Sequence, residues 1–372
     1  MKGKNSYDIT IIITVALLVV IGIIMVFSSS YSYSLGTKGD PFFFLKRLLV
    51  WAVVGSIAMW VFARIKYWTL QRYANILLLG ALTTLILVLT PLGININGAS
   101  RWLGVGSLTV MPSEIAKFAV IIFVPTSIVR KKEKIQTFTY GLLPYLTLCG
   151  IIFGLIYLQP DFSTAFVVCV VIISMVFVGG IKLSHFIALI AMGASGLASM
   201  ITYIFISGKG YKARRITAFL DPWADPSDSG FQAVQSLLAI GSGGLFGKGL
   251  GKSIQKHFYL PEPQNDFIFA IISEELGFIG GVFIILLFVI LIWRGIRVAI
   301  NAPDLLGCLM ASGIISMITV QVMINIAVAT SSMPVTGMPL PFISYGGTSL
   351  VITMACMGIL LNISRHSKLD RS

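Results

Sequence analysis

The chain has 372 residues, of which 56% are hydrophobic and only 11% are charged, and its mean hydropathy is +0.93. These values exclude an ordinary soluble protein, in which about a quarter of the residues are charged. The formal net charge of +13 points to an anionic partner only if the basic residues have no other role.

About ten apolar segments are long enough to cross a bilayer as helices, which takes about 20 residues each. The first resembles the core of a signal peptide, but no small-residue cleavage site follows it, so we expect a retained helix. The predicted fold is an all-α polytopic membrane protein, with residues 1–372 as a single transmembrane domain. In chain order the segments are 9–28, 46–64, 73–91, 113–129, 142–158, 162–179, 184–206, 267–293, 304–330 and 346–364.

The basic residues predict the orientation, because short cytoplasmic loops carry an excess of Lys and Arg. With a cytoplasmic N-terminus, both termini are cytoplasmic and residues 207–266 form a long extracytoplasmic loop between spans seven and eight. Much of the net charge therefore reflects topology, and no nucleic-acid partner is expected. The inner stretches hold 15 of the 27 basic residues, namely Lys2, Lys4, Arg64, Lys66, Arg72, Arg130, Lys131, Lys132, Lys134, Lys182, Arg294, Arg297, Arg365, Lys368 and Arg371.

The loop after span three, NGASRWLGVGSLTVMPSEIAKFAV at 97–120, carries the first group of polar residues that need an explanation. Arg101 lies near its start, and Ser113 is a candidate N-cap of the next helix. Glu114 then falls in the first turn, where the helix dipole favours a negative charge, and Lys117 lies three residues on, on the same face. Two interpretations are open: a self-neutralised pair at a helix start, or a Lys117 that faces the bundle interior as an anion ligand held by Glu114.

The segment LQPDFSTAF at 158–166 joins spans five and six. Its Gln-Pro-Asp sequence predicts a sharp turn, and Asp161 can cap the helix that follows. Capping accounts for this carboxylate alone. It does not explain why Asp161, Lys117, Arg101 and a further aspartate, Asp266, are all predicted near the same outer level of the membrane.

The extracytoplasmic loop carries basic residues that topology does not require, because long loops cross a membrane regardless of charge. Arg214, Arg215, Lys248 and Lys252 are therefore candidate anion ligands, although a solvated, charge-balanced loop explains them equally well. The last two lie in the glycine-rich run GSGGLFGKGLGKS at 241–253, whose spacing does not fit a P-loop. Such a run could wrap a pyrophosphate through its backbone N–H groups or serve as a flexible linker.

Asp266 closes this loop and opens span eight in the run LPEPQNDFIFAIISEELGFIG. An unpaired charge at membrane depth costs roughly 2.5 kcal/mol or more, so such a carboxylate is a functional candidate by default. N-capping of the helix is the alternative explanation. If the cavity around it binds a substrate hydroxyl, Asp266 is the candidate general base.

The segment SSMPVTGMPLPFISYGGTS at 331–349 is too rich in Pro and Gly for a regular helix. Non-helical backbone at membrane depth is tolerated only when it is buried in protein or lines a wet cavity. We therefore expect a folded-back loop that forms a cavity wall. Cys149, Cys169, Cys308 and Cys356 all fall inside apolar segments without metal-ligand spacing, so no disulfide is expected.

An outward-facing basic cavity with one carboxylate suits a lipid with an acyl tail and an anionic head, such as a polyprenyl pyrophosphate. At the level of whole motifs, the chain closely resembles the SEDS family of bacterial peptidoglycan polymerases, which includes the FtsW, RodA and SpoVE proteins. The resemblance covers nearly the whole chain, and its DPW, PEPQ and ISYGG segments are most similar to the division and sporulation branch. The matching motifs, in order, are RWLGVGSLTVMPSEIAKFA, QPDFSTA, FLDPWADPSDSGFQAVQSLLAIGSGGLFGKGLGKS, LPEPQNDFIFAIISEELGFIGG and MPVTGMPLPFISYGGTSL.

The resemblance implies a glycosyltransferase that polymerises lipid II, a disaccharide–pentapeptide on undecaprenyl pyrophosphate, at the outer leaflet of the bacterial cytoplasmic membrane. The implied reaction inverts the anomeric carbon and releases undecaprenyl pyrophosphate. Implied partners are a class B penicillin-binding protein, which is a transpeptidase, and other membrane proteins of division or sporulation. The family's site residues match, in motif order, Arg101 and Trp102, Glu114 and Lys117, Asp161, and finally Asp266.

Two other functions remain open at this stage. Ionisable residues inside a helix bundle also mark translocation paths, so a lipid II flippase is the main alternative. Against it, carriers place their polar sites near the midplane between repeats, whereas these residues are predicted at one surface. A non-catalytic scaffold for the transpeptidase is the third reading. A divalent cation, Mg²⁺ or Mn²⁺, could assist departure of the pyrophosphate, but the sequence identifies no ligand set for it.

Overall fold

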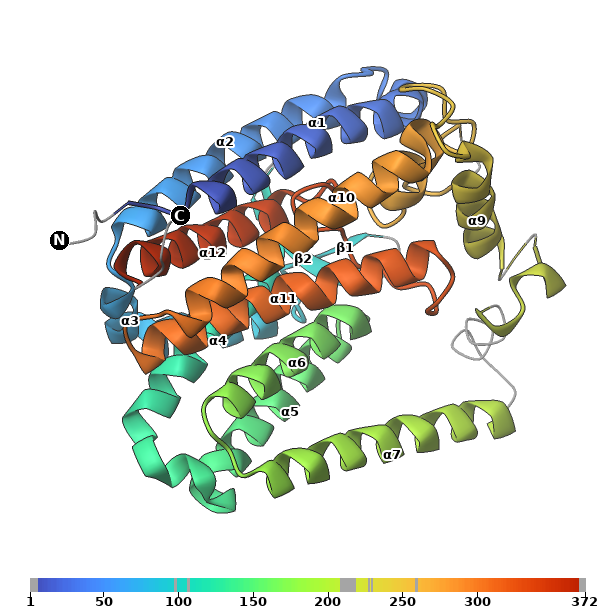
Figure 1. The fold of residues 1–372 in the computed structure, drawn as a ribbon. Helices are drawn as coiled ribbons and strands as arrows, with labels where there is room; N and C mark the ends of the chain where they lie inside the picture. The colour runs from blue at the N-terminus through green and yellow to red at the C-terminus, as the bar shows by residue number, and fades with distance from the viewer. Residues whose placement is uncertain are drawn as a thin grey trace.

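The computed structural model describes residues 6–96, 99–105, 108–207, 219–226, 228, 230–257 and 260–367. Helices dominate this part of the chain (Figure 1). Each of the ten predicted apolar segments coincides with one helix. These are α1 (Ile9–Lys38), α2 (Phe43–Arg64), α3 (Tyr67–Leu87), α4 (Pro112–Lys131), α5 (Leu143–Tyr157), α6 (Phe162–Val178), α7 (Leu183–Ser207), α10 (Ile268–Ile300), α11 (Leu305–Ala329) and α12 (Gly347–His366).

Within the described residues, eight helical segments are long and apolar enough to cross a membrane. They are α1 to α4, the continuous segment Phe138–Tyr157, and α10 to α12. Helix α6, with 17 residues, and the apolar stretch Leu183–Gly193 of α7 are shorter. The protein is thus a multi-pass membrane protein, and the count of ten spans stays a prediction.

The smaller elements lie in the connections. They are the 3-10 helices η1 (Lys132–Gln136) and η3 (Pro222–Ala224), the π-helical turn η2 (Phe138–Leu142), helix α9 (Phe231–Gly243), and the strands β1 (Gly93–Ile96), β2 (Ala99–Val105) and β3 (Leu108–Val110). The strands form an antiparallel sheet in the order β1-β2-β3, with Ile94 opposite Trp102 and Leu103 opposite Val110. This sheet departs from the predicted all-α fold, and its apolar and aromatic residues pair across strands as in larger sheets.

Both described chain ends lie at the same end of the helix bundle (Figure 1). The N–H of Asp8 donates to Ser364 Oγ at 3.3 Å, which joins the start of α1 to the end of α12. Arg294, near the end of α10, forms an ion pair of 2.7 Å with the Asp8 carboxylate. Helix α9 lies at the opposite end (Figure 1). We call that opposite end the outer end, because the sequence predicts it to be extracytoplasmic.

Helix α4 is the most enclosed of the candidate spans, with 78% of its apolar window buried, whereas α2 has only 17% of its window buried. The difference follows from side-chain pattern. Helix α4 buries residues on every face, and α2 exposes large apolar side chains such as Val50, Val53 and Trp60. Exposed apolar residues on a membrane helix face lipid without cost. The helix that carries Glu114 and Lys117 is therefore central, and α2 is peripheral.

Helix α10 is broken near its outer end at Gly277, which has φ 70° and ψ −169°. A loop from the glycine-rich run fills the break. The two N–H groups after Gly277 donate to the carbonyls of Gly244 and Leu245 at 2.8 and 3.2 Å. In return, the N–H groups of Lys248 and Gly249 donate to the two carbonyls at 274 and 275, both at 3.0 Å. The backbone groups freed by the break are thus satisfied inside the protein, as membrane depth requires.

A Gly277→Ala substitution is expected to lower the thermal stability of the protein substantially. The backbone conformation at Gly277 is one that essentially only glycine adopts, and forcing another residue into it costs about 1–3 kcal/mol. A Cβ atom there would also lie 2.3 Å from the N of Gly247. Thermal unfolding of the detergent-solubilised protein measures the effect. Gly150→Ala in α5 is the matched control, because a Cβ at that position meets no atom within 4 Å; equal melting temperatures for the two variants would contradict the account.

Candidate active site

Asp266 lies at the end of the outer loop, two residues before α10 begins, and its main chain is fixed from two sides. The side-chain amide of Asn325 on α11 donates to Asp266 O at 2.9 Å and to Met338 O at 2.8 Å. Next to it, the hydroxyl of Ser344 donates to Asn265 O at 2.6 Å. Asn325 is buried. The position of Asp266 is therefore set by α11 and by the irregular segment 330–346, which the sequence predicted to be a folded loop.

The Asp266 side chain lines a cavity of about 590 Å³ at the outer end. Segments distant in the sequence meet there: the start of α2, the sheet, the start of α4, the loop before α10 and the segment 337–349. The lining residues are Lys46, Arg47, Val50, Trp51, Ala99, Arg101, Trp102, Thr109, Met111, Glu114, Thr164, Glu262, Asn265, Asp266, Gly337, Pro339, Tyr345, Gly346, Gly347, Thr348 and Ser349. The predicted cavity wall at 331–349 is confirmed.

Gly337 lies beside the two charged side chains of greatest interest, those of Asp266 and Arg101. A Cβ atom on Gly337 would lie 3.5 Å from Asp266 Oδ2 and 3.8 Å from Arg101 Nη1. The Asp266 carboxylate and the Arg101 guanidinium therefore both lie close to this glycine, at the wall of the cavity.

Arg101 is held by the turn that the sequence placed before α6. Its Nε donates to Gln159 O at 3.1 Å, and its Nη2 donates to Pro160 O. Asp161 accepts from Thr164 N at 3.2 Å and so caps α6, as predicted, but Asp161 is buried and does not line the cavity. The structure thus joins the Gln-Pro-Asp turn to the cavity through Arg101, and a contact between Asp161 and substrate stays a prediction.

Glu114 and Lys117 form the predicted ion pair, with 2.7 Å between Lys117 Nζ and Glu114 Oε1, and both side chains are buried. Glu114 lines the cavity, whereas Lys117 does not. Among the described residues, Glu114 Oε2 has no hydrogen-bond partner. Ser113 is not the N-cap that the sequence suggested. The helix begins one residue earlier, at Pro112, whose fixed φ suits the first helical position.

The basic residues of the outer loop fall elsewhere. Lys248 forms an ion pair of 2.8 Å with Glu274, Lys252 is exposed, and neither lines the cavity. Arg214 and Arg215 lie outside the described residues. A contact between these four residues and a pyrophosphate stays a prediction. The glycine-rich run itself packs against α10, since a Cβ on Gly247 would lie 2.1 Å from Glu275 O.

Sequence reasoning missed two basic residues of the cavity, Lys46 and Arg47, at the outer start of α2. The signal was available, because basic residues at the outer end of a span run against the positive-inside rule and need another reason. Lys46 Nζ also donates to Asp40 at 2.9 Å. This bond, with a second from Phe42 N, lowers the pKa of the exposed Asp40 carboxyl. Lys46, Arg47 and Arg101 together give the cavity three cationic side chains.

Two carboxylates besides Asp266 line the cavity, Glu114 and Glu262. Within the described ranges, no three or more His, Cys, Asp or Glu side chains gather in a way that would hold a metal ion. The ligand set for such an ion stays as open as the sequence left it.

An Asn325→Leu variant is expected to fold but to lose about tenfold or more of its turnover, because misplacing a reacting group by about 1 Å can cost 10²-fold. The substitution removes both amide bonds that hold the backbone of Asp266 and Met338. Gln321→Leu, on the same helix, is the control, because both polar atoms of Gln321 are buried without a partner among the described residues. Steady-state turnover, normalised to folded protein, should fall in Asn325→Leu and not in Gln321→Leu. Equal activities would show that the two hydrogen bonds from Asn325 do not matter for turnover.

Comparisons with known proteins identify relatives of this chain over nearly its whole length. The family model of cell cycle proteins that groups FtsW, RodA and SpoVE matches residues 8–369. Stage V sporulation protein E of Bacillus subtilis is 48% identical over 98% of this chain and 99% of its own length. The probable peptidoglycan glycosyltransferase FtsW of a Geobacter species is 40% identical over 99% of each chain.

Solved structures show the same fold. A chain from a peptidoglycan synthase complex, studied for the coordination of polymerization and crosslinking, superposes with a TM-score of 0.78 at 31% identity, covering 98% of this chain and 99% of that one. The rod shape determining protein RodA of Thermus thermophilus superposes with a TM-score of 0.71 at 28% identity, covering 98% of both chains. The chain belongs to the cell cycle protein family of FtsW, RodA and SpoVE.

Proposed function

We propose that this protein is a peptidoglycan glycosyltransferase that polymerises lipid II into glycan strands at the outer leaflet, with Asp266 as the general base. The observation that carries the proposal is the cavity in which Asp266 lies with Arg101, Lys46 and Arg47. The names of the FtsW relatives supply the class of reaction. The cavity holds Asp266, our candidate base, together with several cations, and the reaction needs both.

The reaction is a single displacement at the anomeric carbon of the donor. The acceptor hydroxyl oxygen forms a bond to this carbon as the bond to the pyrophosphate oxygen breaks, so the configuration inverts. The acceptor proton passes to the Asp266 carboxylate, and undecaprenyl pyrophosphate leaves with the bonding electron pair. General-base assistance and fixed cations beside the departing charge are both established sources of rate enhancement.

The side of the cavity formed by α2 supports a lipid-linked substrate. Val50 and Trp51 of α2 line the cavity beside Lys46 and Arg47, and α2 is the least buried of the candidate spans. An anionic head group in the cavity can therefore meet basic side chains while its chain passes along an apolar helix toward lipid. Lys46 and Arg47 are our candidates for the pyrophosphate, alongside Arg101.

We further propose that the protein works with a class B penicillin-binding protein in the bacterial cytoplasmic membrane. Its fold matches a chain from a peptidoglycan synthase complex, which supports such a partner. The relatives named for sporulation and as FtsW support a role in spore formation or in cell division.

Incubation of the purified protein with lipid II and a class B partner tests the proposal. Gel electrophoresis of the products should resolve a ladder of glycan strands that a muramidase digests. Lipid II that stays unpolymerised, with a protein shown to be folded and bound to its partner, would contradict the proposed activity.

A further inference from the structure

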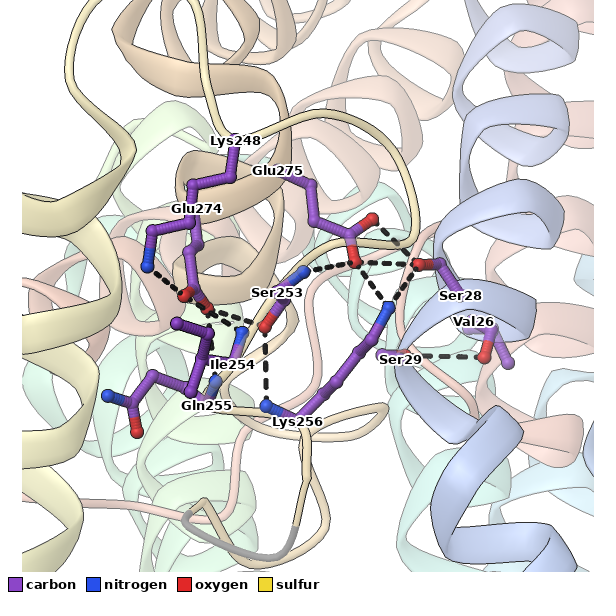
Figure 2. Close-up of polar contacts among 10 residues, drawn as sticks. All are labelled: Val26, Ser28, Ser29, Lys248, Ser253, Ile254, Gln255, Lys256, Glu274 and Glu275. Carbon is purple, nitrogen blue, oxygen red and sulfur yellow. Dashed lines mark hydrogen bonds and ion pairs between the residues drawn. The ribbon is translucent and has the colours of Figure 1, made fainter.

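A second polar cluster, away from the cavity, occupies the outer part of α10 (Figure 2). Its centre is a pair of adjacent carboxylates, Glu274 and Glu275, which are both completely buried. Two buried acids in sequence are expensive unless each has a cation and hydrogen-bond donors. Each carboxylate has a lysine partner and further hydrogen-bond donors, and these groups come from the segment 242–256 or from α1.

Glu274 binds the loop. Its carboxylate accepts from Lys248 Nζ at 2.8 Å and from Ile254 N at 3.0 Å, and it also accepts the hydroxyl of Ser253 (Figure 2). These donors come from both ends of the segment 248–254. The carboxylate therefore closes this part of the loop on itself and against α10.

Glu275 points toward α1 instead (Figure 2). It forms an ion pair of 2.8 Å with Lys256 Nζ, and the hydroxyl of Ser28 on α1 donates to it at 2.7 Å. Lys256 Nζ also donates to Ser28 Oγ at 3.2 Å. Lys256 is buried. One three-membered contact thus connects α10, the loop and α1.

All of these contacts hold one short segment of α10, residues 268–276. The break at Gly277 separates residues 268–276 from the rest of α10, and Asp266 lies directly before this half-helix. Without an unbroken helix, the half-helix cannot take its position from the long membrane-spanning part of α10. Its position depends on the loop bonds at the break, on the two carboxylates, and on Asn325 at the Asp266 end.

We propose that Glu274 and Glu275, with Lys248 and Lys256, are positioning residues for glycosyl transfer: they fix the half-helix 268–276 and so hold Asp266 against the cavity. This inference rests on the proposed role of Asp266. The carboxylates lie eight and nine residues beyond Asp266, about 12 Å along a helix. They line no part of the cavity and act on the reaction through the half-helix.

The alternative is that the cluster merely stabilises the fold. The ion pair between Asp8 and Arg294 allows the two cases to be separated, because it also ties α10 to the start of α1, on the other side of the break. Breaking the Asp8–Arg294 pair or the Lys256–Glu275 pair removes a charge partner from a largely buried contact. Of these two pairs, only Lys256–Glu275 touches the half-helix that leads to Asp266.

The test compares Lys256→Met, Lys256→Met/Glu275→Gln and Arg294→Met in the full-length protein with its transpeptidase partner. Turnover and KM for lipid II are measured on protein that passes a thermal-unfolding check. In parallel, hydrogen exchange is followed in peptides covering 266–276 and 283–300. We expect Lys256→Met to lower kcat by about tenfold or more with little change in KM, since it misplaces a base without touching bound substrate.

The same variant should accelerate exchange in 266–276, and the double variant should recover most of both effects because it leaves no unpaired buried charge. Arg294→Met should affect only 283–300. Unchanged kcat with faster exchange in 266–276, an equal kcat loss in Arg294→Met, or a loss confined to KM would each overturn the inference. If Asp266 is not the base, Asp266→Asn stays active while the exchange results stand, so the two failures are distinguishable.

Discussion

An Asp266→Asn variant is expected to keep its fold and to lose glycan polymerisation by about 10²–10⁴-fold, the usual worth of general-base assistance. The amide has nearly the size of the carboxylate but cannot take up the acceptor proton. Two contacts that hold this position use the backbone: Asn325 binds Asp266 O, and Ser344 binds the neighbouring Asn265 O. They are unchanged by the substitution, so the loss should fall on kcat.

The measurement is the initial rate of strand synthesis from lipid II, with substrate binding measured separately on the same protein. Asp304→Asn is the matched control. Asp304 caps α11 at the opposite end of the bundle, where its carboxylate accepts from Gly307 N and from the hydroxyl of Tyr67. The same chemical change there should lower stability and leave the rate per folded molecule near that of wild type. Similar rates in the two variants would remove Asp266 from the mechanism.

A Lys117→Met variant is expected to destabilise the protein by about 3–5 kcal/mol, because it leaves the charge of Glu114 buried without its partner. The pair lies in α4, the most enclosed candidate span, and both side chains are shielded from solvent. The double variant Glu114→Gln/Lys117→Met should regain much of that stability, since neither buried charge remains.

Thermal unfolding of both variants in the same detergent measures this effect. Activity gives a second measurement, because Glu114 lines the cavity and Lys117 does not. If Glu114 contacts substrate, the double variant will be stable and still poorly active. A Lys117→Met protein as stable as wild type would contradict the expected cost of leaving Glu114 without its partner.

Hydropathy was sufficient to predict the helices, because burying backbone polar groups in lipid leaves a helix as the simplest solution for each apolar segment. All ten segments coincide with helices. Of the four residues that the sequence predicted near one outer level, Arg101 and Asp266 line the same cavity, whereas Asp161 and Lys117 do not. Arg101, Glu114 and Asp266 line one cavity, and the Pro- and Gly-rich segment before α12 forms part of its wall.

The rest depends on contacts between distant segments, which no local pattern encodes. The glycine-rich run suggested a phosphate-binding loop, but several of its glycines are needed where the loop meets the break in α10: a Cβ at Gly243 would lie 2.0 Å from Ser273 O. The sequence analysis did not single out Lys46 and Arg47, which line the cavity because the fold brings the start of α2 to it. Lys248 and the buried Lys256 of the loop pair with Glu274 and Glu275, which the sequence shows only as part of an apolar helix.

The most direct test of the account is one vesicle experiment that records two processes at once. Wild-type and Asp266→Asn proteins are reconstituted in a single orientation with a class B partner, and lipid II is supplied to the leaflet that the cavity faces. Strand synthesis and lipid II translocation are both followed. The account predicts strands with the wild type, none above background with Asp266→Asn, and translocation no faster than in protein-free vesicles. Strand synthesis at the wild-type rate by Asp266→Asn would contradict it, as would translocation that both proteins accelerate without any synthesis.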